Sequence, residues 1–232
     1  MMSRDKESGL DFSTVIASTV HDMKNSLAML MQAHSQWLAR LPDNHQQGPE
    51  QVVIEHEFVH LNGMLVQLLG LYKLGINQLP MLPDYHDLDD FIGGLLAGYQ
   101  EILDSRGIVA RYEIDEAAPL GFFDRELVGS VISNIINNAT RYAGHALLVT
   151  VREENEALVI SVNDDGAGFP AAMIEQQDEY VQGIEHSTAS TGLGLYFAAR
   201  IAALHARNGV PGRIEIANGG ALGGGLFRLY LP

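Results

Sequence analysis

His21 is the first residue of the sequence whose type and neighbours suit chemistry, because Asp22 follows it and Asn25 lies four residues later. A neutral imidazole is a good nucleophile near neutral pH, and a neighbouring carboxylate can hold one ring nitrogen protonated while it raises the basicity of the other. Asn25 lies one helical turn along the same face, where an amide can position a water or a phosphoryl group. A lone histidine on a helix is usually an ordinary surface residue, so His21 needs support from elsewhere.

The segment NIINNATRY (134–142) places Asn134 and Asn138 four residues apart on an expected helix that also presents Arg141 and Tyr142. The amide oxygen of Asn138 can bind a magnesium ion, and Arg141 can neutralise phosphate charge. Two asparagines in a helix more often form a polar face. The segment therefore gains weight only from the motifs that follow it.

The run DDGAG (164–168) follows the expected strand ALVISVN. The carboxylate of Asp164 can accept a hydrogen bond from an exocyclic amine, while Gly166 and Gly168 let the backbone approach a flat ring closely. Asp165 leaves a small ambiguity of register, and the glycine spacing favours Asp164. Alone, such a run is most often a turn.

The segment STGLGL (190–195) begins an expected helix with Gly192 and Gly194 on either side of Leu193. Glycines at a helix N-terminus expose several backbone N–H groups toward one point and let an anion lie on the helix dipole. A glycine-rich helix start is common. The order and spacing of these motifs together are what argue for a nucleotide site.

The element that must position His21 is a helix with a heptad pattern, which predicts packing nearly parallel to other helices. A turn at 41–49 separates it from a second helix of the same kind. We expect this hairpin to pair with a second copy in a four-helix bundle, because two helices alone leave much apolar surface in water. A monomeric hairpin folded onto the rest of the chain is the alternative. The pattern comprises Ile16, Val20, Met23, Leu27, Leu30, His34, Trp37 and Leu41, then Ile54, Phe58, Leu61, Leu65, Leu68 and Tyr72.

The elements that must position the other motifs follow a linker at 74–86, which holds two prolines. Helices and strands alternate beyond it, and the long polar loop 166–192 is typical of a lid or a binding loop. We therefore expect an α+β fold for the chain. The expected helices are 87–105, 124–143 and 193–207, and the expected strands are 107–114, 146–153, 156–163, 212–217 and 225–231.

The bulk composition excludes several classes of protein. The net charge of -15 and the lack of a dense basic patch argue against nucleic acid or an anionic membrane surface as partner. The chain has no cysteine, which excludes disulfides and thiolate metal sites. No signal peptide and no run of about 18 apolar residues is present, so we expect a cytoplasmic protein with no membrane contact.

Taken in order, the motifs resemble the boxes of the sensor histidine kinases. HDMKNSL (21–27) resembles their H box, NIINNATRY their N box, DDGAG their G1 box and STGLGL their G2 box, and the end GGLFRLYLP (224–232) resembles their closing strand. Four motifs in one order are stronger evidence than any single motif. The resemblance implies a dimerisation and histidine-phosphotransfer hairpin at 10–76 and an ATP-binding α/β sandwich of the Bergerat (GHKL) type at 84–232.

The resemblance also implies roles for single residues. His21 would be the phosphoacceptor, Asp22 its polarising acid, and Asn25 the residue that supports dephosphorylation of a partner. Asn138 would be the Mg²⁺ ligand and Asp164 the adenine contact, with Gly192 and Gly194 around the phosphates of ATP. The further cofactor-binding residues implied are Asn134, Arg141, Tyr142, Gly166, Gly168 and Leu193.

The partners that the resemblance implies are a second copy of the chain and the receiver domain of a response regulator. The eleven residues ahead of the hairpin are too few for a sensor domain. We therefore expect the signal to come from a separate sensor protein or from a longer chain.

Three other functions compete with the kinase. An ATP hydrolase of this fold is expected to have a glutamate base where this chain has Asn134, whose amide cannot accept a proton at pH 7. A histidine phosphotransfer relay with a decayed nucleotide site is disfavoured, because Asn138, Asp164 and Gly192 are intact. A dimeric scaffold would explain the heptads and leave the other motifs without a purpose.

Overall fold

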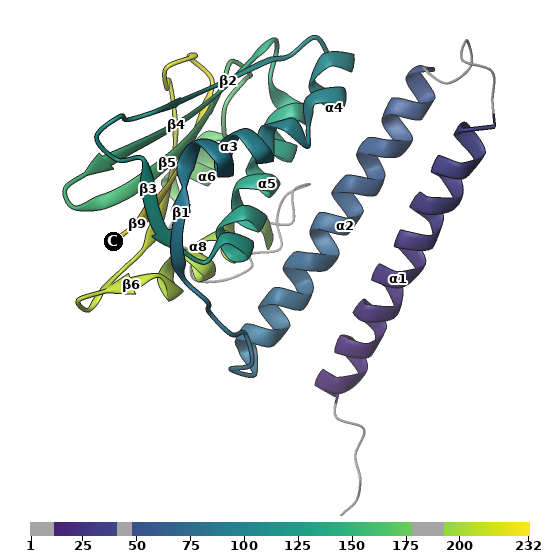
Figure 1. The fold of residues 1–232 in the computed structure, drawn as a ribbon, viewed down its shortest axis with the longest axis horizontal. Coiled ribbons are helices and arrows are strands. Elements are labelled where there is room, and N and C mark those ends of the chain that lie inside the picture. The colour runs from purple at the N-terminus through teal and green to yellow at the C-terminus, as the bar shows by residue number, and fades with distance from the viewer. Residues whose placement is uncertain (1–11, 41–47, 178–192) are drawn as a thin grey trace, which may run out of the picture. The chain divides into compact units, whose positions relative to one another are not determined.

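The computed structural model describes residues 12–40, 48–177 and 193–232. It divides the chain into two compact units that separate between Leu79 and Pro80, inside the expected linker. The first unit is helical and the second combines sheets with helices, which confirms the mixed fold class (Figure 1). Among the described residues, no helix is both long and apolar enough to cross a bilayer.

The first unit is a hairpin of helices α1 (Phe12–Leu38) and α2 (Pro49–Gly75), which pack along each other (Figure 1). Pro49 is in the first turn of α2, where a missing N–H costs nothing and the fixed φ favours helix. The heptad residues divide into two sets. Val20 and Leu27 are buried, at 4% and 7% exposure, whereas Met23, Leu30 and Trp37 of the other heptad position are 52%, 59% and 57% exposed.

Helix α2 shows a related division. Ile54, Leu61 and Leu68 repeat every seven residues and are all exposed. Each helix therefore presents one of its two heptad positions to solvent. A heptad pattern predicts that both apolar positions are buried. In this hairpin one of the two is exposed on each helix, so apolar surface remains available for a further packing partner.

The second unit is built on a five-stranded sheet with the order β2-β4-β5-β9-β8. Strand β2 is parallel to β4, and the other neighbours are antiparallel. The bounds of the strands are β2 (Val109–Ile114), β4 (Ala146–Glu154), β5 (Ala157–Asp164), β8 (Arg213–Asn218) and β9 (Gly225–Leu231).

Helices cover one face of this sheet, and the main core lies between the two layers (Figure 1). Side chains alternate between the faces of a strand, so Val149, Ile160 and Leu229 point to the same side, and all three are fully buried. The helices are α3 (Leu88–Ala97), α4 (Gln100–Ser105), α5 (Arg125–Tyr142), α6 (Ala171–Glu175) and α8 (Leu193–Leu204).

The structure corrects the single helix expected at 87–105, because α3 and α4 are separate there. Gly98 ends α3, and Tyr99 precedes α4 while its hydroxyl donates a hydrogen bond to the Ser133 carbonyl on α5. Two small sheets were also not expected: β1 (Asp84–Asp87) pairs with β3 (Leu120–Phe123), and β6 (Ala206–Arg207) pairs with β7 (Val210–Pro211).

Candidate nucleotide and phosphoacceptor site

His21 lies on α1 with its side chain 66% exposed, and two neighbours approach the same ring nitrogen. The side-chain amide nitrogen of Asn25 is 3.2 Å from Nδ1 of His21. A carboxylate oxygen of Asp22 is 3.7 Å from the same Nδ1. No described residue hydrogen-bonds Nε2, so that nitrogen is the one open to a reaction partner.

The two neighbours favour opposite tautomers of the imidazole. An amide nitrogen donates, so Asn25 binds Nδ1 only when that atom has its lone pair free. Asp22 needs a proton on Nδ1, and 3.7 Å is too long for a hydrogen bond. In this arrangement Asn25 rather than Asp22 holds the ring, unless the amide turns over and presents its oxygen. The polarising role expected of Asp22 thus requires a local rearrangement.

Helix α5 positions the asparagines of the second motif. Asp124 begins the helix, and its carboxylate accepts a hydrogen bond from the backbone N–H of Leu127 at 3.0 Å, which satisfies one of the free donors of the first turn. Asn134 and Asn138 are four residues apart and are both partly buried. Arg141 and Tyr142 are exposed in the last turn.

Asn134 meets the start of α8. A Cβ atom on Gly194 would lie 2.6 Å from Nδ2 of Asn134, so a larger residue would force either the amide or the helix to shift. The same Nδ2 is buried and has no hydrogen-bond partner among the described residues. An unpaired buried donor costs about 1–3 kcal/mol, and this one belongs to a residue that the sequence predicts to bind the nucleotide.

Helices α5 and α8 run antiparallel. Asp124, ahead of α5, contacts His205, behind α8, whereas Asn134 contacts Gly194 in the first turn of α8. Asn138 is one turn farther along α5, about 6 Å past Asn134. It therefore lies beyond Leu193, the first described residue of α8.

Asp164 and Asp165 end β5 and use their oxygens differently. One oxygen of Asp164 accepts from the backbone N–H groups of Gly166 at 2.8 Å and Gly225 at 3.2 Å. Its other oxygen accepts no hydrogen bond from the described residues. Asp164 is therefore held rigidly and keeps one free acceptor.

Asp165 is instead occupied by the loop that follows α5. Its carboxylate accepts from the backbone N–H groups of Gly144 at 2.8 Å, His145 at 2.9 and 3.0 Å, and Ala146 at 3.1 Å. The hydrogen bond from His145, with those from Ala146 and Gly144, lowers the pKa of Asp165 below 3.8. Asp165 thus fixes a loop, whereas Asp164 keeps the free acceptor that the predicted adenine contact needs.

Glycines close the backbone around Asp164. A Cβ on Gly166 would meet the carbonyl oxygen of Tyr142, and one on Gly224 would lie 2.5 Å from the Gly166 nitrogen. Gly168 has φ +77, and a Cβ there would lie 2.4 Å from the side-chain oxygen of Asn218. These positions need glycine for space, and at Gly168 also for conformation.

The described residues fit a bound adenine nucleotide with its metal. An unpaired amide donor on Asn134 and a free carboxylate oxygen on Asp164 are the groups that such a ligand needs. No group of three or more histidine, aspartate or glutamate side chains that could hold a metal ion occurs in the described part of the chain. A magnesium ion here would therefore be held by Asn138 together with phosphate oxygens, which is how Mg²⁺ often binds in phosphoryl-transfer sites.

Part of the predicted site lies outside the described residues. Ser190 and Gly192 belong to 178–192, so only Leu193, Gly194 and Leu195 of the fourth motif can be placed, and Leu195 is buried in the core. Leu193 and Gly194 are partly buried in the first turn of α8.

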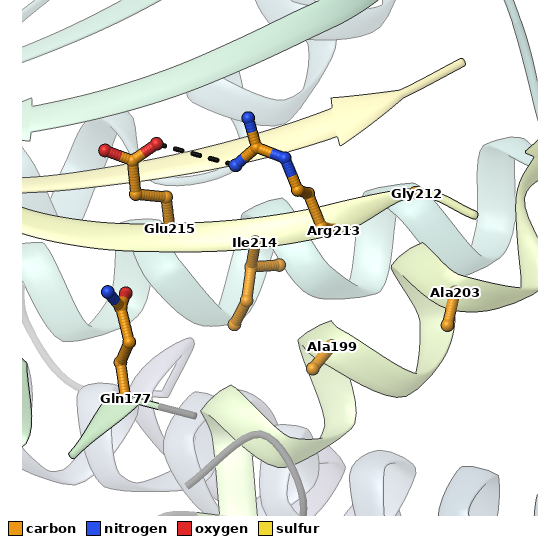
Figure 2. A pocket seen from close by; sticks show the side chains of 7 residues that line it. All are labelled: Gln177, Ala199, Ala203, Gly212, Arg213, Ile214 and Glu215. Atoms are coloured by element: carbon orange, nitrogen blue, oxygen red, sulfur yellow. Dashed lines mark ion pairs between the residues drawn. The ribbon is translucent and has the colours of Figure 1, made fainter. Parts of the chain in front are cut away.

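An open pocket of about 420 Å³ lies between β8 and α8 (Figure 2). At one end the side-chain oxygen of Gln177 accepts a hydrogen bond from the Ile216 N–H at 3.3 Å, and on β8 Arg213 and Glu215 form a 3.6 Å ion pair. The pocket shares no residue with the predicted nucleotide site. Its lining is Gln177, Ala199, Ala203, Gly212, Arg213, Ile214 and Glu215.

Two contributors to the site were not singled out from the sequence. Gly224 and Gly225 contact Asp164 through backbone N–H groups, because β9 pairs with β5 and brings the glycine cluster beside the third motif. Asn163 is buried and accepts a hydrogen bond from the Ala221 N–H at 3.1 Å, which holds the same cluster. The glycine cluster is Gly219, Gly220, Gly223, Gly224 and Gly225, and its glycine content was the available signal in the sequence.

Residues 123–232 match the family described as Histidine kinase-, DNA gyrase B-, and HSP90-like ATPase. The Sensor-like histidine kinase SenX3 of Mycobacterium tuberculosis is 25% identical over 200 residues, which cover 82% of this chain and 48% of SenX3. Histidine kinase P4 of Formosa agariphila is 23% identical over 232 residues, which cover 96% of this chain and 16% of that protein. The chain thus spans about half or less of these relatives.

Solved structures show the same fold. ShkA, determined at full length in complex with AMPPNP, is similar with a TM-score of 0.66 and 18% identity, over 95% of this chain and 46% of ShkA. The Acinetobacter baumannii histidine kinase AdeS has a TM-score of 0.57 and 18% identity, over 91% and 96%. Residues 123–232 thus match the model of this ATPase family, and the two relatives named above are histidine kinases.

Proposed function

We propose that this chain is the catalytic core of a sensor histidine kinase, which binds Mg-ATP in its second unit and transfers the γ-phosphoryl group to His21. The observation that carries the proposal is the crossing of α5 and α8, where Gly194 leaves room for the amide nitrogen of Asn134, which has no partner among the described residues. The crossing supports the proposal because a hydrogen-bond donor, the proposed metal ligand Asn138 and the described beginning of α8 lie near one another there.

Each site residue that the structure describes has a chemical task in the proposal. The free oxygen of Asp164 accepts from the exocyclic amine of adenine, and Gly166 lets the ring approach the backbone. The N–H groups at the start of α8 and the positive end of its dipole bind the phosphates. Asn138 places the metal, which neutralises the charge that develops on the phosphates during transfer.

The transfer step uses the ring nitrogen that is open. Nε2 of His21 attacks the γ-phosphorus, the bond from that phosphorus to the β–γ bridging oxygen breaks, and ADP leaves with the metal. Nε2 must carry its lone pair for this attack, so the ring proton must lie on Nδ1. Asp22 supports that tautomer once it replaces Asn25 at Nδ1.

We also propose that the hairpin pairs with a second copy. The exposed heptad residues of α1 and α2 are the stripe that such a partner would cover, since they continue the spacing of the buried set. The phosphoryl group would pass from His21 to an aspartate of a receiver domain, which can reach the exposed imidazole from solvent.

The proposal is tested with γ-labelled ATP and magnesium. Wild type should acquire label that acid removes, because phosphohistidine is acid-labile, and His21→Ala should acquire none. His145→Ala is the matched control, since His145 is also exposed and should leave labelling unchanged. Label retained in His21→Ala would exclude His21 as the acceptor, and a wild type that binds ATP without becoming labelled would exclude the kinase.

A further inference from the structure

We propose that His205 is a positioning residue that holds α8 in register with α5 and so keeps the nucleotide site assembled at the far end of this helix pair. The inference rests on the proposed function, because it assigns His205 an effect on nucleotide binding. His205 follows the last residue of α8 and is absent from the four motifs.

Two hydrogen bonds fix the ring of His205, which is only 6% exposed. Its Nε2 is 3.0 Å from the backbone nitrogen of Asp124, and its Nδ1 is 2.9 Å from the carbonyl oxygen of Ile201. A backbone N–H only donates and a carbonyl only accepts. The ring is therefore neutral with its proton on Nδ1, and Nε2 is the acceptor that ties α8 to α5.

Asp124 connects three segments through its hydrogen bonds: the end of α8, the first turn of α5 and the chain around Leu82. Its N–H donates to His205, one carboxylate oxygen accepts from Leu127 in the first turn of α5, and the other accepts from the Leu82 N–H at 2.7 Å. Asp124 is 5% exposed, so water does not readily replace these bonds. The end of α8 is thus bonded to the residue that caps α5 and holds the incoming chain.

The distance along both helices relates this junction to the site. Asp124 precedes Asn134 by ten residues, and Gly194 precedes His205 by eleven. At 1.5 Å per residue these stretches are about 15 and 16 Å long. The antiparallel pair is therefore hydrogen-bonded at one end, between His205 and Asp124, and closely packed at the other, where Asn134 approaches Gly194.

The apolar contacts between these two ends do not by themselves set the register of α8 along α5. Apolar burial depends on area and has little direction, so it holds the helices together and resists a small slide only weakly. A hydrogen bond between buried groups has a fixed length and geometry. Without the His205 bond, α8 can shift along α5, and Gly194 then no longer lies against Asn134.

Two variants distinguish the effect of losing the bond to Asp124 from the effect of losing the imidazole ring. In His205→Gln the side-chain oxygen reaches the position of Nε2 and can still accept from Asp124. In His205→Asn the amide reaches only the position of Nδ1, so it keeps the bond to Ile201 and loses the one to Asp124. Both variants replace the ring by a neutral amide, which makes them matched controls for each other.

The first readout is the Kd for a fluorescent ATP analogue with magnesium, measured well below the unfolding temperature of each variant. His205→Asn should bind about tenfold more weakly than wild type, and His205→Gln should remain within about twofold of it. Equal Kd values for all three proteins, even with a lower unfolding temperature in His205→Asn, would show a role in stability alone and overturn the inference. Equal weakening in both variants would overturn it as well.

The second readout does not depend on nucleotide. The chain has no cysteine, so spin labels can be placed at the exposed positions Glu126 and Ala203 through cysteine substitutions. The distance distribution between the labels should broaden in His205→Asn and stay narrow in His205→Gln. If wild type bound no nucleotide, the proposed function would fail. The distance distributions between the spin labels would then show by themselves whether His205 positions α8: a broad distribution in His205→Asn alone would support this role, and equal distributions in both variants would contradict it.

Discussion

Asp164 and Asp165 are identical side chains in adjacent positions, and their hydrogen bonds give them different tasks. Asp165 accepts three backbone N–H groups of the loop after α5, whereas Asp164 keeps one oxygen free for a ligand. The sequence favours Asp164 through the glycine spacing, but it contains no sign that the loop 144–146 folds back onto Asp165.

Asp165→Asn should destabilise the second unit by about 1 kcal/mol at neutral pH, because an amide oxygen replaces a partly solvated carboxylate as acceptor. Since the pKa of Asp165 is lowered in the folded chain, its stabilisation is fully present above pH 3.8 and is lost as the pH falls through the folded pKa. Urea unfolding of both proteins should show a difference that shrinks below pH 3.8. A difference that stays constant down to pH 2 would contradict this role.

Asn25→Ala should shift the tautomer of His21. With the amide gone, Asp22 is the remaining neighbour of Nδ1, so the proton should move to Nδ1 and leave Nε2 free to attack. The ¹⁵N chemical shifts of the ring nitrogens measure the tautomer directly. Asp22→Asn is the control and should retain the Nε2–H form, so identical tautomer ratios in both variants would rule out competition for Nδ1.

Gly194→Ala tests the crossing of α5 and α8. The added Cβ would lie 2.6 Å from Nδ2 of Asn134, so either the amide or the start of α8 must move. Binding of a fluorescent ATP analogue should weaken by about tenfold or more, and crowding of this kind costs about 1–3 kcal/mol of stability.

Gly94→Ala is the matched control for that substitution. Gly94 lies within α3, is exposed, and has no atom within 4 Å of the position of a new Cβ. Alanine there should stabilise the helix by about 0.5–1 kcal/mol and leave nucleotide affinity unchanged. Equal nucleotide affinity in Gly94→Ala and Gly194→Ala would show that the crossing is not part of the site.

The elements with strong patterns are the ones that the sequence predicts well. Helix α5 and strand β9 lie within one residue of their expected bounds, because long amphipathic or alternating segments bury one face. The separate helices α3 and α4 were not foreseen, since the break at Gly98 depends on Tyr99 reaching the Ser133 carbonyl. Strand β1 consists of the polar residues DYHD, which carry no strand signal before β3 pairs with them.

The site residues could likewise be predicted from the sequence only where a local motif contains them. The motif residues can be read from the chain, but the bonds from Gly225 to Asp164 and from His205 to Asp124 join residues 61 and 81 positions apart. Only the pairing of β5 with β9 and the packing of α5 on α8 bring these residues together. Local spacing cannot predict such contacts.

At the scale of the whole molecule, the described part of the hairpin exposes an apolar stripe with heptad spacing. Leu30→Glu should convert a dimer into a monomer, because it places a charge in the stripe that a second copy would bury. Light scattering after size exclusion gives the mass. Gln36→Glu adds the same charge at an exposed position outside the stripe and should remain dimeric, and a monomeric wild type would contradict the four-helix bundle.

Calorimetric titration of ATP into the whole chain in magnesium buffer shows most directly whether the second unit holds a metal-bound nucleotide. One molecule should bind per chain, and the heat should disappear when EDTA removes the metal or when Asn138→Ala removes its ligand. A folded wild-type protein that gives no heat of binding would contradict the nucleotide site, and with it the transfer of phosphate to His21.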